Sequence, residues 1–188
     1  MDRKLLLVDL DSGDVGTQTI DPQYARDLIG GSGLAARLLW DRLDPRRDPL
    51  DAASPLVWMT GPLTGSGSPT PGRFSICARS PQTGLWGESN VGGFVGPELR
   101  YAGYDGILIT GRANAPAYLW IHDNHVEVRE ATHLWGKADT AETQRRIKSE
   151  TGEPHARVAC IGQAGENGVP YASIIVDHGR AAGRTGMG

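Results

Sequence analysis

The chain has 188 residues, 39% of them hydrophobic, and a formal net charge of −3. This length supports one sizeable core, and a mildly acidic chain without a basic cluster argues against nucleic-acid binding. The longest apolar runs fall short of the roughly 18 residues of a membrane span, and the N-terminal run ends at Val8, too early for a signal peptide, so we expect a cytoplasmic protein that contacts no membrane.

Short apolar runs separated by turn residues predict strands and two helical segments in the first half of the chain. Residues 4–10 and 15–20 predict a hairpin across an Asp-Ser-Gly-Asp turn. Asp21 and Pro22 have the order of an N-cap and first helical residue, and a second helix follows after Gly30 and Gly31. The remaining elements expected here are strands over 56–60, 73–79 and 84–88 and a short helix over 97–102.

The second half repeats this outline. We expect a strand over 105–110, a hairpin over 117–121 and 126–129, a helix over 140–150 with the capping-box spacing of Asp139 and Glu142, and strands over 157–161 and 171–176. Because the same order occurs twice, the sequence predicts an α+β fold of two similar strand-rich subdomains, about 1–103 and 104–188, related by a pseudo-twofold axis. The loops 72–93 and 179–188 would then face each other.

One glycine-dense stretch, Gly61–Gly103, stands out from the rest of the chain. It carries Phe74, Ile76 and Trp86, which a flexible surface linker would lack. Since glycine has no Cβ, its backbone amides can approach a flat or anionic group closely. This stretch therefore predicts an ordered backbone packed against such a group.

Arginines accompany the glycines at both predicted loops. Arg73 follows Gly72, while Arg180 and Arg184 enclose two small residues and a glycine. Guanidinium groups beside exposed backbone amides suit a phosphate or pyrophosphate, although ordinary surface arginines in turns explain this composition equally well. Asn90 fits either a left-handed turn or an oxygen ligand for a bound ion.

Other motifs carry weaker arguments. Residues 31–36 match the dinucleotide-binding pattern G-x-G-x-x-A, but a helical segment precedes them where that motif requires a strand. His122 and His125 have a possible metal-ligand spacing, but they lie at a hairpin tip, which favours a solvated turn. His178 is of more interest because it lies beside Arg180. Glu166 fits a ligand-facing carboxylate and a turn cap equally, and no set of nucleophilic catalytic residues is apparent.

The two cysteines, Cys77 and Cys160, lie in separate apolar runs. Small buried side chains are the simplest interpretation of both. Two thiols cannot supply the four ligands of an iron–sulfur cluster. We therefore expect neither a cluster nor a redox role for these cysteines.

Six strings occur in order and at consistent spacing: GPLTG (61–65), GRFSICARSPQTG (72–84), SNVGGFVGPELRYAGYDG (89–106), HLWGK (133–137), IGQAGEN (161–167) and GRAAGRTGMG (179–188). Together they resemble the N-terminal domain of the tungsten-dependent aldehyde ferredoxin oxidoreductase family. The resemblance extends from residue 3 to residue 188 and is far more specific than any single glycine motif.

This resemblance implies a domain that holds tungsten, or molybdenum, between two molybdopterin dithiolenes, with magnesium bridging the pterin phosphates. Seven positions match the pterin-binding motifs of the family: Arg73, Asn90 and Gly92 for one pterin, and Arg180, Ala181, Gly183 and Arg184 for the other. The backbone carbonyls of Asn90 and Ala181 would be the magnesium ligands. Magnesium prefers oxygen donors and often shares phosphates, so this set is chemically coherent.

The family reaction converts an aldehyde and water to a carboxylic acid and passes electrons through a [4Fe–4S] cluster to ferredoxin. The cluster cysteines and proton-transfer residues of the family lie in later helical domains. We therefore expect residues 1–188 to be the metallopterin-binding domain of a truncated or split enzyme, with the helical domains, or a separate subunit carrying them, as its partner. By itself it is expected to bind the cofactor weakly or not at all and to leave aldehydes unoxidised. The alternative is a non-catalytic pterin-cofactor carrier or assembly partner.

Overall fold

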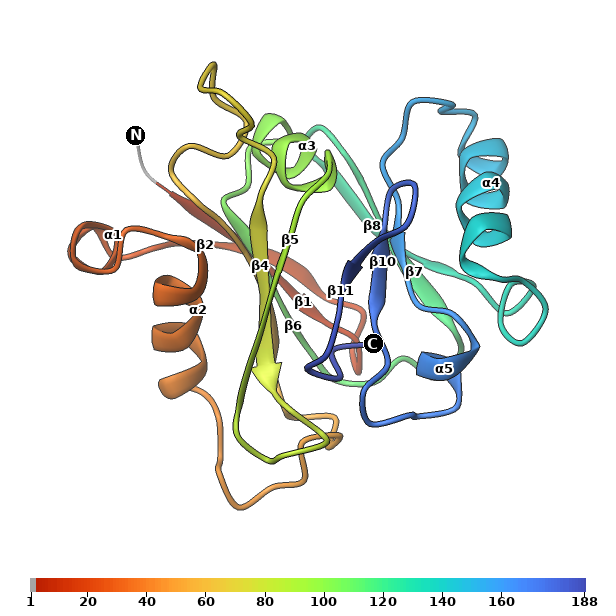
Figure 1. The fold of residues 1–188 in the computed structure, drawn as a ribbon, viewed down its shortest axis with the longest axis horizontal. Helices are drawn as coiled ribbons and strands as arrows, with labels where there is room; N and C mark the ends of the chain where they lie inside the picture. The colour runs from red at the N-terminus through yellow and green to blue at the C-terminus, as the bar shows by residue number, and fades with distance from the viewer. Residues whose placement is uncertain (1–2) are drawn as a thin grey trace.

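A computed structural model describes residues 3–188, and its largest unit is a six-stranded sheet (Figure 1). The strand order is β2-β1-β6-β3-β4-β5, with β1 and β6 parallel and the other pairs antiparallel. The strands are β1 (Lys4–Asp9), β2 (Val15–Thr19), β3 (Leu56–Thr60), β4 (Phe74–Arg79), β5 (Trp86–Val91) and β6 (Gly106–Thr110). This arrangement makes β5 an edge strand.

The helices are α1 (Pro22–Asp27), α2 (Gly31–Trp40), α3 (Val95–Tyr101), α4 (Thr140–Thr151) and the short α5 (Gln163–Glu166). Helices α1, α2 and α4 begin where the sequence predicts them, α3 begins two residues before the predicted position, and α5 was not predicted. Asp21 caps α1 by accepting the N–H of Gln23 at 2.8 Å, and Asp139 caps α4 by accepting the N–H of Glu142 at 2.7 Å. Both predicted caps are therefore confirmed. Among the described residues, no helix is long and apolar enough to cross a membrane.

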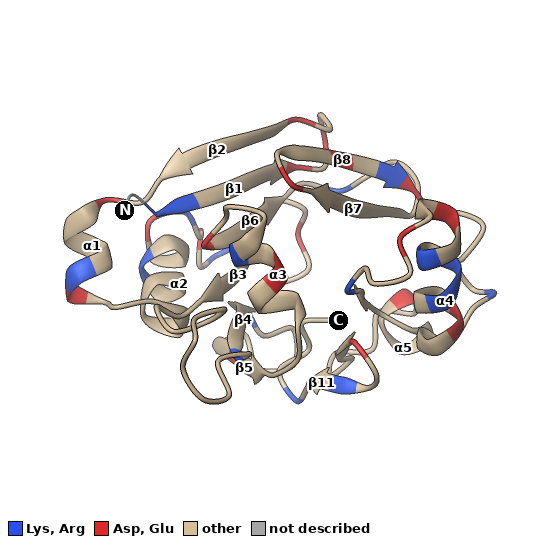
Figure 2. Ribbon diagram, turned by 90° about the horizontal axis from the view of Figure 1, so that it is seen from above, with Lys and Arg blue, Asp and Glu red and all other residues tan. Residues whose placement is uncertain are grey.

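The six-stranded sheet is covered on both faces. Helix α2 packs Leu34, Leu38 and Leu39 against one face. On the other face lies the hairpin of β7 (Ala117–His122) and β8 (His125–Glu130), whose apolar side chains pack against residues of β1 and β6. Figure 2 shows this hairpin alongside β1 and β6, on the side of the molecule opposite β11. Because both faces of the sheet are covered, the central strands β3 and β6 carry mostly apolar side chains.

A second, three-stranded sheet has the order β11-β10-β9, formed by β9 (Ala159–Cys160), β10 (Ile174–Val176) and β11 (Arg180–Ala182). Its strand β11 is an edge and lies next to β5 (Figure 1). One apolar cluster joins the two sheets: Phe74, Ile76 and Val91 from the larger sheet, with Ile174, Val176 and Ala182 from the smaller. The cluster holds the two sheet edges side by side.

The α+β class predicted from the sequence agrees with this structure. The division at residue 103 does not follow the sheets, because β6, from the predicted second half, lies between β1 and β3. Strand β6 is apolar on both faces, and a central position buries both. The strand predicted over 171–176 covers 174–176 alone, and the predicted loop 179–188 contains β11. The pseudo-twofold relation between two similar subdomains stays a prediction.

Candidate functional site

The predicted site residues lie where β5 and β11 meet. Ser89 of β5 donates its hydroxyl hydrogen to the carbonyl oxygen of Gly183 at 2.8 Å, and its Oγ lies 2.7 Å from Oγ1 of Thr185. The Phe94 N–H, just after β5, donates to Asp177 Oδ2 at 2.6 Å in the turn before β11. These bonds span more than 80 residues of sequence and bring the two glycine–arginine segments together.

Arg73 and Asn90 form the first group at the site. Arg73 Nη1 donates to the Asn90 side-chain oxygen at 2.7 Å and to the Asn90 carbonyl oxygen at 3.2 Å. The alternation of β5 places Asn90 on the exposed face of the strand, opposite Ser75 of β4. Gly92 follows two residues later, and a Cβ built there would lie 3.9 Å from Cδ of Arg180. The first group therefore borders the second directly.

The second group comes from β11 and the residues that follow it. Arg180, Ala181 and Arg184 are exposed, and Gly183 is half-buried. Arg184 has a φ of 75°, an uncommon left-handed conformation for a side chain of this size. Within residues 3–188, neither Arg180 nor Arg184 forms an ion pair with a carboxylate. Both guanidinium groups are thus available to an external anion.

Several glycines in this region have a different role from the predicted one. A Cβ at Gly72, Gly87 or Gly93 would lie under 3.0 Å from a neighbouring group of the protein: the Gly93 carbonyl oxygen, Met187 Cε and Asp177 Oδ2, respectively. These glycines let protein segments approach one another, so the glycine density is not evidence of a ligand at those positions. At Gly92, by contrast, the nearest atom is the flexible Arg180 side chain, which leaves the backbone accessible.

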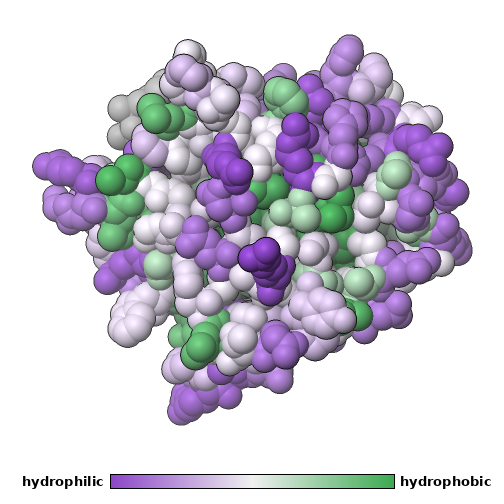
Figure 3. Space-filling model, viewed as in Figure 1, coloured by the Kyte–Doolittle hydropathy of each residue, from purple (hydrophilic) through white to green (hydrophobic). Residues whose placement is uncertain are grey.

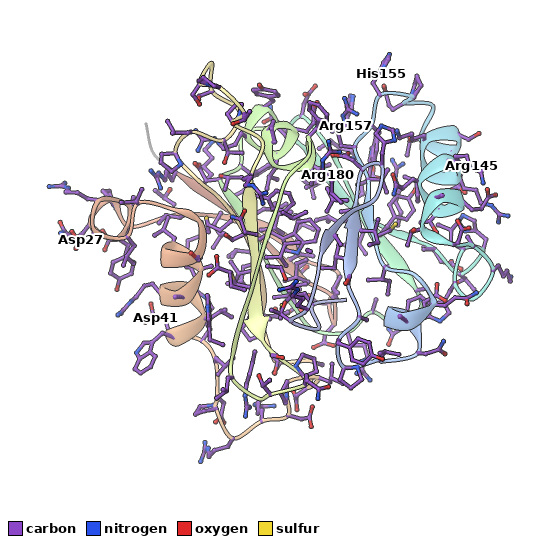
Figure 4. All side chains as sticks on the ribbon, viewed as in Figure 1. Asp27, Asp41, Arg145, His155, Arg157 and Arg180 are labelled. Carbon is purple, nitrogen blue, oxygen red and sulfur yellow. The ribbon has the colours of Figure 1, made fainter. Side chains whose placement is uncertain are left out.

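Two residues near the site were not identified from the sequence. Asp177 is 3% exposed and lies in the turn between β10 and β11. Arg157 places its guanidinium carbon 4.4 Å from the centre of the Phe94 ring, and its buried Nε has no hydrogen-bond partner in the described part of the chain. Figure 4 shows Arg157 and Arg180 reaching the same region of the molecule. An aspartate at a strand end is a recognisable turn signal, but its partner 83 residues away is not visible in the sequence.

The alternative motifs do not form a site. His122 and His125 are exposed at the hairpin tip, and among residues 3–188 no group of three or more His, Cys, Asp or Glu side chains could hold a metal ion. Glu166 accepts the N–H of Gly136 at 3.0 Å, which favours its role as a turn cap. His178 is exposed beside the Asp177 turn. Residues 31–36 open helix α2 and follow helix α1, so the dinucleotide-binding motif lacks its strand.

Neither cysteine has the environment of a reactive thiol. Burial raises the pKa of Cys77 to about 12 and that of Cys160 to about 11, because a desolvated thiolate is disfavoured. The two cysteines lie in different sheets, on β4 and β9. At neutral pH both stay protonated. Cys77 is buried as predicted, whereas Cys160 is half-buried.

The surface around the site combines apolar and strongly polar residues. In the view of Figure 1, an apolar area lies over β10 near the middle of the molecule and hydrophilic residues border it (Figure 3). Phe94, next to the site, is 49% exposed, and Leu85 and Trp86, at the other end of β5, are 70% and 46% exposed. A surface of this kind suits a ligand with an apolar ring system and charged groups.

The residues present fit the two pterin phosphates and the magnesium ion that the resemblance implies. Guanidinium groups reach the site from both sheet edges, and the accessible backbone at Gly92 leaves room for a bulky group. The Asn90 carbonyl oxygen, an oxygen donor of the type magnesium prefers, is within hydrogen-bonding distance of Arg73.

The chain is an α+β domain with arginine- and glycine-bearing segments at two adjoining sheet edges. The chain belongs to the aldehyde ferredoxin oxidoreductase family, whose N-terminal domain matches residues 5–188. It is 43% identical over 185 residues to the tungsten-containing aldehyde ferredoxin oxidoreductase of Pyrococcus furiosus and 44% identical to that of Thermococcus kodakarensis. In both comparisons the matched region covers 98% of this chain and 30% of the relative. The chain therefore spans about a third of the length of these proteins.

Relatives with other activities share the same domain. The WOR-like subunit of an aliphatic sulfonate oxidoreductase from Pyrococcus furiosus is 35% identical over 202 residues, covering 98% of this chain and 32% of that protein. The solved active-site complex BamBC of benzoyl coenzyme A reductase, with 1,5-dienoyl-CoA, matches with a TM-score of 0.95 and 41% identity. That match covers 98% of this chain and 28% of the solved chain. The domain is therefore common to relatives named for different substrates.

Proposed function

We propose that this chain holds a tungsten bis-molybdopterin cofactor at the seam between β5 and β11, as the cofactor-binding domain of a larger oxidoreductase. The observation that carries the proposal is the meeting of Arg73, Arg180 and Arg184 around exposed backbone at two sheet edges. Since Arg180 and Arg184 are exposed and have no carboxylate partner within residues 3–188, their guanidinium groups are available to bind an external anion. The family's tungsten-containing members make a pterin phosphate the preferred anion.

Each group of residues has a distinct part in this proposal. Arg73, Asn90 and Gly92 would line one pterin, and Arg180, Ala181, Gly183 and Arg184 would line the other. The carbonyl oxygens of Asn90 and Ala181 would bind the magnesium ion that joins the phosphates. The cofactor supplies two-electron redox chemistry when bound, and the protein supplies placement, orientation and charge compensation. Molybdenum in place of tungsten would require the same contacts.

The reaction we propose for the whole protein is oxidation of an aldehyde to a carboxylic acid, with electrons passing through a [4Fe–4S] cluster to ferredoxin. The aldehyde ferredoxin oxidoreductases among the relatives support this reaction. The cluster would lie outside these residues, because Cys77, which is buried, and Cys160, which is half-buried, lie in separate sheets and two thiols cannot supply four ligands. The exposed side chains of Leu85, Trp86 and Phe94 support coverage of this surface by further domains or a partner subunit.

Metal and pterin analysis tests this proposal. The product of the whole reading frame that contains residues 1–188, purified without oxygen from cells grown with tungstate, is expected to carry two pterins per tungsten. Residues 1–188 produced alone should carry far less of both and should not oxidise aldehydes. Stoichiometric tungsten with turnover in residues 1–188 alone would contradict the expected weak binding.

The downstream DNA sequence and the activity of the whole product separate the carrier alternative. DNA immediately downstream that encodes cysteine-bearing helical domains favours a catalytic protein. A whole product that holds pterin but never reacts with any aldehyde would favour a cofactor carrier or assembly partner. A whole product without pterin or tungsten would contradict both functions.

A further inference from the structure

A buried acidic side chain connects the two segments of the site. Asp177 occupies the turn between β10 and β11, is 3% exposed, and accepts the backbone N–H of Phe94 through Oδ2 at 2.6 Å. Its own N–H donates to the carbonyl oxygen of Val158 at 2.9 Å. Phe94 follows Gly92 and Gly93, whereas Asp177 precedes Arg180 by three residues. One side chain therefore ties the segment after β5 to the segment before β11.

Asp177 and Gly93, on the two sides of this contact, both have backbone conformations with a positive φ angle. Asp177 has a φ of 49°, in the left-handed region that aspartate and asparagine tolerate better than most residues. Gly93 has a φ of 116°, and a Cβ there would come under 3.0 Å from Asp177 Oδ2. A strained conformation of this kind persists only where surrounding contacts fix it.

A second contact acts on the same turn. The Arg157 guanidinium stacks on the Phe94 ring, with 4.4 Å between Cζ and the ring centroid, and Arg157 directly precedes Val158. Phe94 is thus held through its backbone by Asp177 and through its side chain by Arg157. Asp177 lies between two strands of the smaller sheet, and Arg157 lies two residues before its first strand. Both contact Phe94, which follows the edge strand β5 of the larger sheet.

We infer that Asp177 is a positioning residue that fixes the distance between the two cofactor-binding segments, an inference that rests on the proposed function. Without the Asp177–Phe94 bond, the turn at Gly92 and Gly93 would lose its backbone tie to the smaller sheet and would be held less tightly relative to Arg180. Guanidinium groups on the two segments could then no longer contact both phosphates of one rigid cofactor at once. Asp177 itself needs no contact with the cofactor for this role.

Paired substitutions separate the hydrogen bond from the backbone conformation. Asp177→Gly keeps the left-handed conformation without cost but removes the acceptor, whereas Asp177→Asn keeps both the conformation and an oxygen acceptor. Asp123, with a φ of 52° in the exposed β7–β8 turn, provides the matched control through Asp123→Gly. All variants are made in the whole reading-frame product, from cells grown with tungstate.

The first measurement is amide hydrogen exchange at Phe94. Loss of a hydrogen bond to a carboxyl group should accelerate this exchange by about tenfold or more in Asp177→Gly, with β1 and β6 amides unchanged. Asp177→Asn and Asp123→Gly should leave Phe94 exchange close to that of the unmodified protein. An unchanged rate at Phe94 in Asp177→Gly would overturn the inference.

The second measurement is pterin and tungsten content per folded protein. Asp177→Gly should lose most of both, and Asp177→Asn should restore them. Because the content is measured per folded protein, a loss of stability alone would not lower it. Equal pterin content in Asp177→Gly and the unmodified protein would refute the positioning role alone. Absence of pterin from the unmodified protein would instead refute the proposed function, and the positioning role with it.

Discussion

Replacing Gly93 by alanine is expected to lower the free energy of unfolding by about 3 kcal/mol or more, because two costs add. The first is conformational, since a φ of 116° lies in a region that side chains other than glycine rarely adopt. The second is steric, since the new Cβ would meet Asp177 Oδ2 under 3.0 Å and Arg180 Cδ at 3.4 Å. The Asp177 oxygen is held by the Phe94 N–H and has little freedom to move.

Chemical denaturation of Gly93→Ala beside Gly103→Ala separates these costs. Gly103 has a similar φ of 93°, but a Cβ there would meet nothing within 4 Å. Gly103→Ala should therefore show the conformational cost alone, about 1–2 kcal/mol. Equal losses in the two variants would mean that the close approach of Gly93 to Asp177 is unimportant for stability.

The second large effect is expected on cofactor binding. Replacing both Arg180 and Arg184 by alanine removes two charge-assisted contacts to phosphate, each contributing about 1.5–3 kcal/mol. The affinity for the cofactor should fall by roughly a hundredfold or more, since 1.4 kcal/mol corresponds to a factor of ten. Because both side chains are exposed and lack carboxylate partners within residues 3–188, stability should change little.

Tungsten and pterin content of the whole reading-frame product measures this effect. The matched control is Arg145→Ala with Arg146→Ala on helix α4, which removes the same charge from an exposed surface where both arginines pair with Glu142. This control should keep its full cofactor content. If the two double variants lose cofactor equally, the effect comes from net charge and the assignment of Arg180 and Arg184 is wrong.

The sequence was sufficient for the elements whose signals are local. The aspartate caps of α1 and α4 and the hairpin across His122 and His125 depend on neighbouring residues, and each lies where it was predicted. The pairing of β6 was not predictable in this way. Its apolar residues indicate a buried strand. Its pairing with β1 and β3, however, depends on contacts with residues about 100 and about 50 positions away, respectively.

The site shows the same division between local and distant information. Arg73 and Arg180 were recognised because they lie in glycine-rich strings, and the structure brings their segments together at β5 and β11. The glycine density itself was misread in part, since Gly72, Gly87 and Gly93 make room for protein atoms. Asp177 was missed because only the folded chain shows which backbone N–H its side chain accepts.

The most direct test of the whole account is X-ray diffraction from crystals of the whole reading-frame product, measured at the tungsten absorption edge. The account predicts one strong anomalous peak at the seam of β5 and β11, with phosphate density beside Arg73, Arg180 and Arg184 and a magnesium ion at the carbonyl oxygens of Asn90 and Ala181. A tungsten peak bound elsewhere in the protein, with these three arginines facing only solvent, would contradict it.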